Sequence, residues 1–305
     1  MAYYSGTAGS LSALRTALLT HAQADGWMLT GDVLSKAGVY FQITEDATNI
    51  KCLGCESNAV ANPAPNVVSI GRIFQRTGYT TREISFPCNY EVFGFAQEFY
   101  LVANYDVDSY QWMAFGKSTV PGLLGQGGWC GATLGKFSVA TLGGTGPVYV
   151  TLTGGGTLFQ VETTAALFWA TVQNSDGARN CWINHGIDAH GWTYNGTVAD
   201  APIGIRHASP LISLQPSVWN SEAALLPVRC LKQRPSFKSS LIADLNNARQ
   251  IRIDNLSAGD VLTIGVDKWK VFPWYRKNAS SRDGGGGVGV NHTGTFGWAI
   301  RYEGP

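Results

Sequence analysis

Two cysteines stand close enough in the sequence to act together. Cys52 and Cys55 form a C-x-x-C pair, a spacing that can hold zinc or carry out dithiol chemistry. A structural zinc site needs a second ligand pair, and a thioredoxin-like pair begins a helix that follows a strand. The neighbouring sequence shows neither feature, so ordinary thiols are the favoured interpretation and metal binding stays the alternative.

Two imidazoles and a carboxylate form the second candidate for chemistry. His185, Asp188 and His190 lie within seven residues and are ligand types that metals accept. Their spacing does not match a helical pair, and Gly186 disfavours a helix. Ordinary loop histidines are therefore favoured, and metal binding and acid–base catalysis stay open as alternatives.

Two glycine-containing stretches are similar to nucleotide-binding loops only in part. Phe115–Ser118 ends like a phosphate loop, but Gln111 stands where that pattern needs its first glycine. The run Gly284–Gly289 is not followed by a helix that could face a phosphate. No hydrolase signature appears either, although two carboxylates could still meet from separate strands. The sequence thus predicts no catalytic residues, no metal and no cofactor, and we expect a protein that is not an enzyme.

The elements that must position these residues are mostly strands. Leu11, Leu14 and Leu18 have helical spacing, with Ser10 as an N-cap and Gly26 as a stop. After this helix, short alternating segments separated by turn residues predict strands as far as residue 302. We therefore expect a mainly β protein with one N-terminal helix, built of β-sandwich or small β-barrel units with long Gly-rich loops.

The clearest hairpin runs from Phe99 to Phe115, with large apolar side chains on both of its faces. Such a hairpin is buried on two sides within the chain, or is closed on one side by another subunit. Four aromatic residues are our candidates for core or interface positions: Tyr105, Tyr110, Trp112 and Phe115.

Composition divides the chain into three predicted domains. We expect residues 1–117 to form an α+β domain with an antiparallel sheet. Residues 118–235 are expected to form a Gly-rich β segment of low charge, and residues 236–305 a small basic β unit. Residues 118–175 contain only two charged side chains, Lys136 and Glu162. This segment is either folded into the β structure or part of a subunit interface.

Charge is sparse and unevenly distributed. Charged residues make up 14% of the 305 residues and the net charge is +1, so the whole chain presents no field that would attract nucleic acid or a membrane. Residues 1–110 nevertheless carry a net charge of −4 and residues 229–282 one of +7. These regions either neutralise each other within one subunit or join copies head to tail. In the second case the docking patch would contain Lys268, Lys270, Arg276 and Lys277.

The remaining features favour a chain that folds in a reducing cytoplasm. The first residues contain neither the basic nor the apolar region of a secretion signal, and no apolar run is long enough to cross a membrane. Six cysteines in 305 residues are far fewer than a disulfide-stabilised scaffold contains.

Three stretches resemble virion structural proteins of tailed bacteriophages. They are Phe93–Val102 (FGFAQEFYLV) continuing through Tyr110–Ser118 (YQWMAFGKS), Asp267–Trp274 (DKWKVFPW) and Thr293–Tyr302 (TGTFGWAIRY). The resemblance implies a component of the tail, baseplate or neck, present in several copies that make symmetric contacts. Its partners would be further copies of itself and other phage tail proteins, in a virion assembled in the host cytoplasm. A receptor- or carbohydrate-binding tail-tip protein and a cell-envelope hydrolase are the alternatives.

Overall fold

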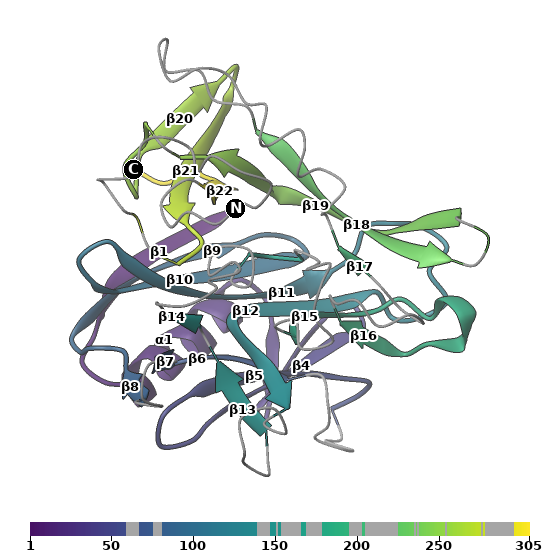
Figure 1. Cartoon of the computed structure of the whole chain (residues 1–305), viewed down its shortest axis with the longest axis horizontal. Coiled ribbons are helices and arrows are strands. Elements are labelled where there is room, and N and C mark those ends of the chain that lie inside the picture. Colours follow the sequence, from purple (N-terminus) through teal and green to yellow (C-terminus); the bar gives the residue numbers. More distant parts are fainter. Residues whose placement is uncertain are drawn as a thin grey trace.

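The structure is a computed structural model that describes residues 1–58, 67–75, 81–138, 147–150, 152–153, 166–168, 179–194, 203–204, 225–234, 236, 238–253, 255–275, 277 and 296–305. In this part of the chain, one α-helix lies against a large antiparallel sheet, and a second antiparallel sheet packs on the opposite face of the large one (Figure 1). A small three-stranded sheet completes the described elements.

The helix α1 (Leu11–Ala24) begins and ends where the sequence predicts. The Ser10 hydroxyl accepts a hydrogen bond from the Ala13 N–H at 3.1 Å, which satisfies one of the free amide groups at the helix start. At the other end Gly26 has a φ of +87°, a left-handed conformation that glycine adopts without strain. Leu14 and Leu18 are fully buried against the large sheet, as their spacing indicates.

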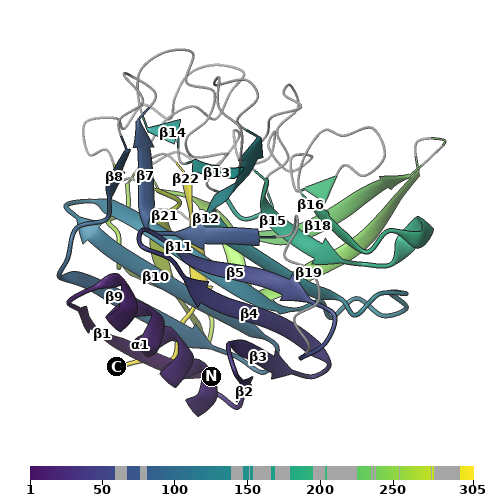
Figure 2. The same ribbon diagram turned by 90° about the horizontal axis from the view of Figure 1, so that it is seen from below.

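Within the described residues, the large sheet contains thirteen strands and curls around α1. The helix contacts β1 and β9 at one end of the strand order and β4 and β2 at the other, so the two ends of the sheet approach each other across it (Figure 2). The main path is, in spatial order, β1 (Ala2–Ala8), β9 (Cys88–Gly94), β10 (Glu98–Asp106), β11 (Ser109–Lys117), β12 (Gly128–Ser138), β6 (Val67–Ile70), β5 (Ile50–Cys55), β4 (Val39–Glu45), β3 (Val33–Lys36) and β2 (Met28–Thr30). Beside it, β13 (Pro147–Val150) and β15 (Arg179–Asn184) pair with β12, and β16 (Trp192–Tyr194) pairs with β15.

The second sheet is formed mainly by the C-terminal part of the chain. Its six strands are, in spatial order, β17 (Ile203–Gly204), β18 (Leu226–Arg234), β19 (Lys238–Arg252), β22 (Phe296–Arg301), β21 (Asp267–Pro273) and β20 (Val261–Ile264). The small sheet contains β14 (Leu152–Thr153), β7 (Arg72–Gln75) and β8 (Thr81–Glu83), and a short 3₁₀ turn, η3 (Ile187–Ala189), separates β15 from β16.

The hairpin of β10 and β11 separates two apolar cores. On one face, Phe99 and Phe115 stack on each other and join the core that contains α1. On the other face, Tyr100 and Trp112 pack against Trp298 of the second sheet. Strand side chains alternate between faces, so a hairpin with large apolar side chains on both faces needs cover on both sides. The chain supplies that cover itself.

The expected fold class, mainly β with one N-terminal helix, is confirmed. The predicted domain boundaries do not coincide with a break in strand pairing. β11 and β12, on either side of position 118, are neighbours in the large sheet, and β18 and β19, on either side of position 235, form a hairpin. The run Gly284–Gly289 lies outside the described residues, as does about half of the predicted Gly-rich segment.

Candidate assembly surface

The predicted aromatic residues lie in the interior of the chain. Trp112 and Phe115 have no exposed surface, and Tyr105 is almost completely buried. Tyr110 is half-buried, and its ring packs against Phe272. Of the two predicted roles, core and interface, the core role fits these side chains, because the second sheet and α1 already cover both faces of the hairpin.

Of the four predicted basic residues, the three that the structure describes do not form one exposed patch. Lys268 is exposed, but Lys277 donates a hydrogen bond to the Ile253 carbonyl oxygen, and Arg276 lies outside the described residues. Lys270 donates to a Glu91 carboxylate oxygen at 2.5 Å and lies over the rings of Tyr3 and Tyr302. Burial lowers the pKa of Lys270, but the hydrogen bond and negative charge of Glu91 outweigh burial and raise that pKa overall. This pair joins the acidic and basic regions of the sequence within one subunit.

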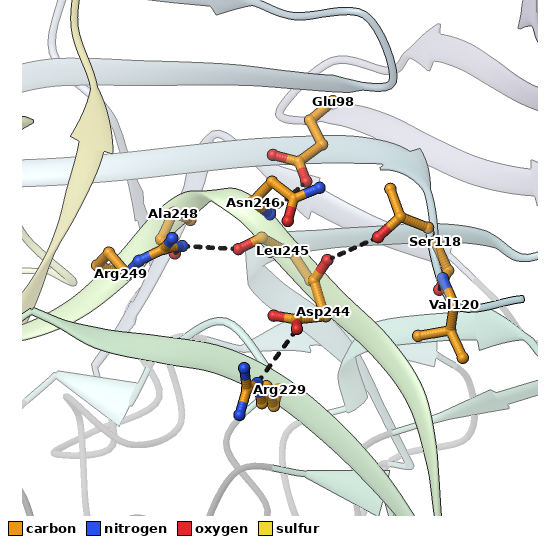
Figure 3. Close-up of polar contacts among 10 residues, drawn as sticks. Glu98, Ser118, Val120, Arg229, Asp244, Leu245, Asn246, Ala248 and Arg249 are labelled. Atoms are coloured by element: carbon orange, nitrogen blue, oxygen red, sulfur yellow. Dashed lines mark hydrogen bonds and ion pairs between the residues drawn. The ribbon is translucent and has the colours of Figure 1, made fainter. Parts of the chain in front are cut away.

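Glu98 is the most deeply buried carboxylate of the described residues, and it joins the two sheets (Figure 3). One of its oxygens accepts from the Asn246 N–H at 2.9 Å. The other accepts from the Asn247 N–H, the Asn247 side-chain amide and the Tyr100 hydroxyl at 2.8–3.0 Å. Both asparagines lie where β19 bulges away from β18, since Pro227 pairs with Arg249 but Val228 pairs with Leu245. Glu98 therefore supplies acceptors to amide groups that the bulge removes from the sheet.

The electrostatics of Glu98 fit this structural role. Burial raises the pKa of Glu98, and the hydrogen bonds from Tyr100, Asn247 and Asn246 oppose that rise. A buried carboxyl with a raised pKa is also a candidate general acid. Here, however, both oxygens are occupied by structural donors. The nearby carboxylate of Asp244 forms an ion pair with Arg229, with a nitrogen–oxygen distance of 3.1 Å (Figure 3).

The C-x-x-C pair lies within a strand. Cys52 and Cys55 are three residues apart on β5, so their side chains leave opposite faces of the sheet. Cys52 contacts Cys130, and burial raises the pKa of the Cys52 thiol well above its ordinary value. Gly54, which lies between Cys52 and Cys55, packs against the ring of Trp192 so closely that a Cβ atom on Gly54 would overlap the ring. Packing of the ring of Trp192 thus accounts for this glycine.

The histidine loop is held by internal contacts. The His185 ring is fully buried, its Nδ1 accepts from the Ile187 N–H at 2.9 Å, and its centroid lies 6.5 Å from that of His190. Burial, followed by the positive charges of Lys232 and His190, lowers the pKa of His185 to about 4. Asp188 is engaged with Arg234 at 2.7 Å. In the described part of the chain, no group of three or more His, Cys, Asp or Glu side chains is arranged to hold a metal ion.

One exposed apolar feature was not recognised as a surface in the sequence. β20 is the edge strand of the second sheet and pairs only with β21 among the described strands. Val261 and Ile264 are 43% and 47% exposed, and Val266 in the following turn is 97% exposed. The strand itself was predicted, but its position at an edge depends on the order of the strands.

No family model matches the sequence, and no curated protein is significantly similar to it. Among the described residues, no helix has both the length and the apolar character that a membrane span requires.

Proposed function

We propose that the chain is a non-enzymatic structural component of a tailed-phage particle, in its tail, baseplate or neck. Several copies associate symmetrically with one another and with other tail proteins, in a virion assembled in the host cytoplasm. The observation that carries this proposal is the open edge of β20, where Val261, Ile264 and Val266 expose apolar surface to solvent. In the described part of the chain most large apolar side chains are buried, whereas three are exposed at this one sheet edge. Such an edge presents a surface suited to another chain.

The stretches that carry the phage resemblance support the same proposal. They contribute Tyr100, Trp112, Trp274 and Trp298 to one core between the two sheets. Trp274 and Trp298 stack with ring centroids 4.8 Å apart, and Trp112 lies 5.2 Å from Trp298. The resemblance therefore concerns the scaffold that holds the second sheet, and with it β20, in place.

The perturbed titratable groups also favour a structural role. Glu98 uses both oxygens to join the sheets, and the Nδ1 of His185 orders its own loop. Neither arrangement leaves the carboxylate or that imidazole nitrogen directed toward a substrate.

Size-exclusion chromatography with light scattering tests the proposal on the purified chain. We expect a mass above the 32.7 kDa of one subunit that rises with protein concentration. Association through an apolar edge would persist in high salt, whereas docking through Lys268 would weaken as salt screens its charge. A monomer at every concentration that binds glycans or cleaves cell-envelope material would contradict the proposal.

A further inference from the structure

The open edge of β20 has a defined backbone direction. Ile264 and Asp267 are paired on either side of the two-residue turn Gly265–Val266. In a hairpin with such a turn, the residues next to the turn exchange both of their hydrogen bonds, and the pairing then alternates along the strands. The backbone groups of Ile264 and Leu262 therefore face β21. Those of Val261 and Thr263 face the open edge.

Nothing in β20 itself prevents another strand from adding to this edge. Natural edge strands are commonly protected by lysine, proline, a bulge or an inward-pointing charge. The four residues Val261–Ile264 include no proline and no charge, and their pairing with β21 is regular. In Figure 1, β20 lies at the end of the second sheet that is remote from the large sheet.

We propose that β20 pairs antiparallel with β20 of a second copy, around a two-fold axis that lies midway between Thr263 and the partner's Thr263. This inference rests on the proposed function and specifies one of its contacts. A two-fold axis perpendicular to the joined sheets pairs residues that lie on the same face. When it lies midway between a residue whose backbone groups point outward and the copy of that residue, the two exchange both of their hydrogen bonds. Thr263 is the more central of the two residues that meet this condition.

The side chains of β20 are complementary to themselves in this register. Leu262 lies opposite the partner's Ile264 and Ile264 opposite the partner's Leu262, so two apolar pairs form on one face. Thr263 lies opposite the partner's Thr263, a cross-strand pair that sheets favour. β20 therefore recognises a second copy of itself without needing a different sequence.

The charges near β20 permit this approach. Lys268 pairs with Thr263 on the neighbouring strand, so the two copies of Lys268 would be three strand spacings apart. At about 4.8 Å per spacing this is about 14 Å. That distance exceeds the Debye length of about 8 Å at physiological salt, so repulsion between the two lysines is largely screened. Asp260 would lie opposite the apolar side chain of Val266.

The size of the contact sets the expected strength. Four residues from each copy bury much less than the roughly 1,200 Å² of a stable interface. We therefore expect weak association of the purified chain that depends on concentration. Within a particle, other contacts would hold the copies in place and raise the effective concentration of the edge.

Cysteine cross-linking tests the register directly. In a Thr263→Cys variant the two thiols would be carried by directly opposed residues, whose Cα atoms lie about 5.5 Å apart, a separation that a disulfide bridges. We expect oxidised glutathione to convert this variant into a covalent dimer on a non-reducing gel. The six native cysteines are free and buried, so they contribute little background. The control is Ser239→Cys, which places a thiol at an exposed position on β19.

A second pair of variants keeps the test decisive if the cysteine variant folds poorly. Ile264→Asp puts a charge against the apolar partner and should abolish the rise in mass with concentration. Val107→Asp makes the same kind of change at an exposed hairpin tip, where Val107 is 82% exposed, and should leave the rise intact.

The outcomes separate the register from the function. Oligomers that form without a Thr263→Cys cross-link and that tolerate Ile264→Asp would overturn the β20 pairing and leave the proposed function standing. A chain that neither cross-links nor associates at any concentration would overturn the β20 pairing. If that monomer also binds glycans or cleaves cell-envelope material, it would overturn the proposed function as well.

Discussion

Glu98 shows how a single side chain joins elements that are distant in the sequence. Its partners Asn246 and Asn247 lie almost 150 residues further along the chain, and no local motif marks any of the three. Their contact depends on the bulge in β19, which arises from the pairing of whole strands. Sequence analysis could identify Glu98 as an acidic residue beside an apolar strand, but it could not predict these contacts.

Replacing Glu98 with glutamine should destabilise the fold. In Glu98→Gln an NH₂ group replaces one acceptor oxygen and faces donors that then lose their partner. We expect the free energy of unfolding to fall by about 1–3 kcal/mol, as for other buried groups left without a hydrogen bond. Urea unfolding followed by tryptophan fluorescence measures this change. Glu56→Gln, at an exposed position, is the matched control, and equal effects of both variants would refute the role given to Glu98.

His185 should make stability depend on pH. Its folded-state pKa of about 4 lies below the ordinary value of 6.5, so between these values the unfolded chain binds more protons. The contribution of His185 to the free energy of unfolding is therefore complete above about pH 6.5 and is lost as the pH falls toward 4. Within this window the free energy of unfolding falls by at most about 1.4 kcal/mol per pH unit. Urea unfolding from pH 4.5 to 7 should give a flatter profile for His185→Gln than for the unchanged chain. Parallel profiles would contradict this assignment.

The β10–β11 hairpin was predicted because its signal is local. Alternation, a polar turn and resumed alternation predict the strands, and large side chains on both faces predict burial on two sides. What covers each face depends on distant segments, so sequence analysis left another subunit as an alternative. In the structure, α1 covers one face and β22 and β21 cover the other.

Trp112 tests this two-sided burial. Trp112→Ala removes a ring that contacts Trp274 and Trp298, and the cavity left behind should lower the free energy of unfolding by about 3–5 kcal/mol. The near-ultraviolet circular dichroism of the tryptophan cluster should weaken in the same variant. Val107→Ala, at the exposed tip of the same hairpin, should change stability by less than about 0.5 kcal/mol. A Trp112→Ala effect of that small size would place the ring outside the core.

At the scale of the whole molecule, the acidic N-terminal region and the basic C-terminal region of the sequence meet within one subunit at one ion pair. Lys270 and Glu91 are 179 residues apart in the sequence, yet they form an ion pair that is partly shielded from water. Sequence analysis could count these charges but not pair them, because pairing depends on how the two sheets pack. The exposed edge of β20 escaped prediction for a similar reason, since local alternation identifies a strand without indicating its place in a sheet.

Quantitative mass spectrometry of purified phage particles tests the central claim most directly. Under the proposed function the chain is encoded by a tailed phage. Particles of that phage would be purified on a density gradient, and copies of the chain would be counted against the major capsid protein. The account predicts a fixed number of copies per particle that is a multiple of a small symmetry number and that resists a salt wash. A chain that is produced during infection but absent from the washed particles would contradict it.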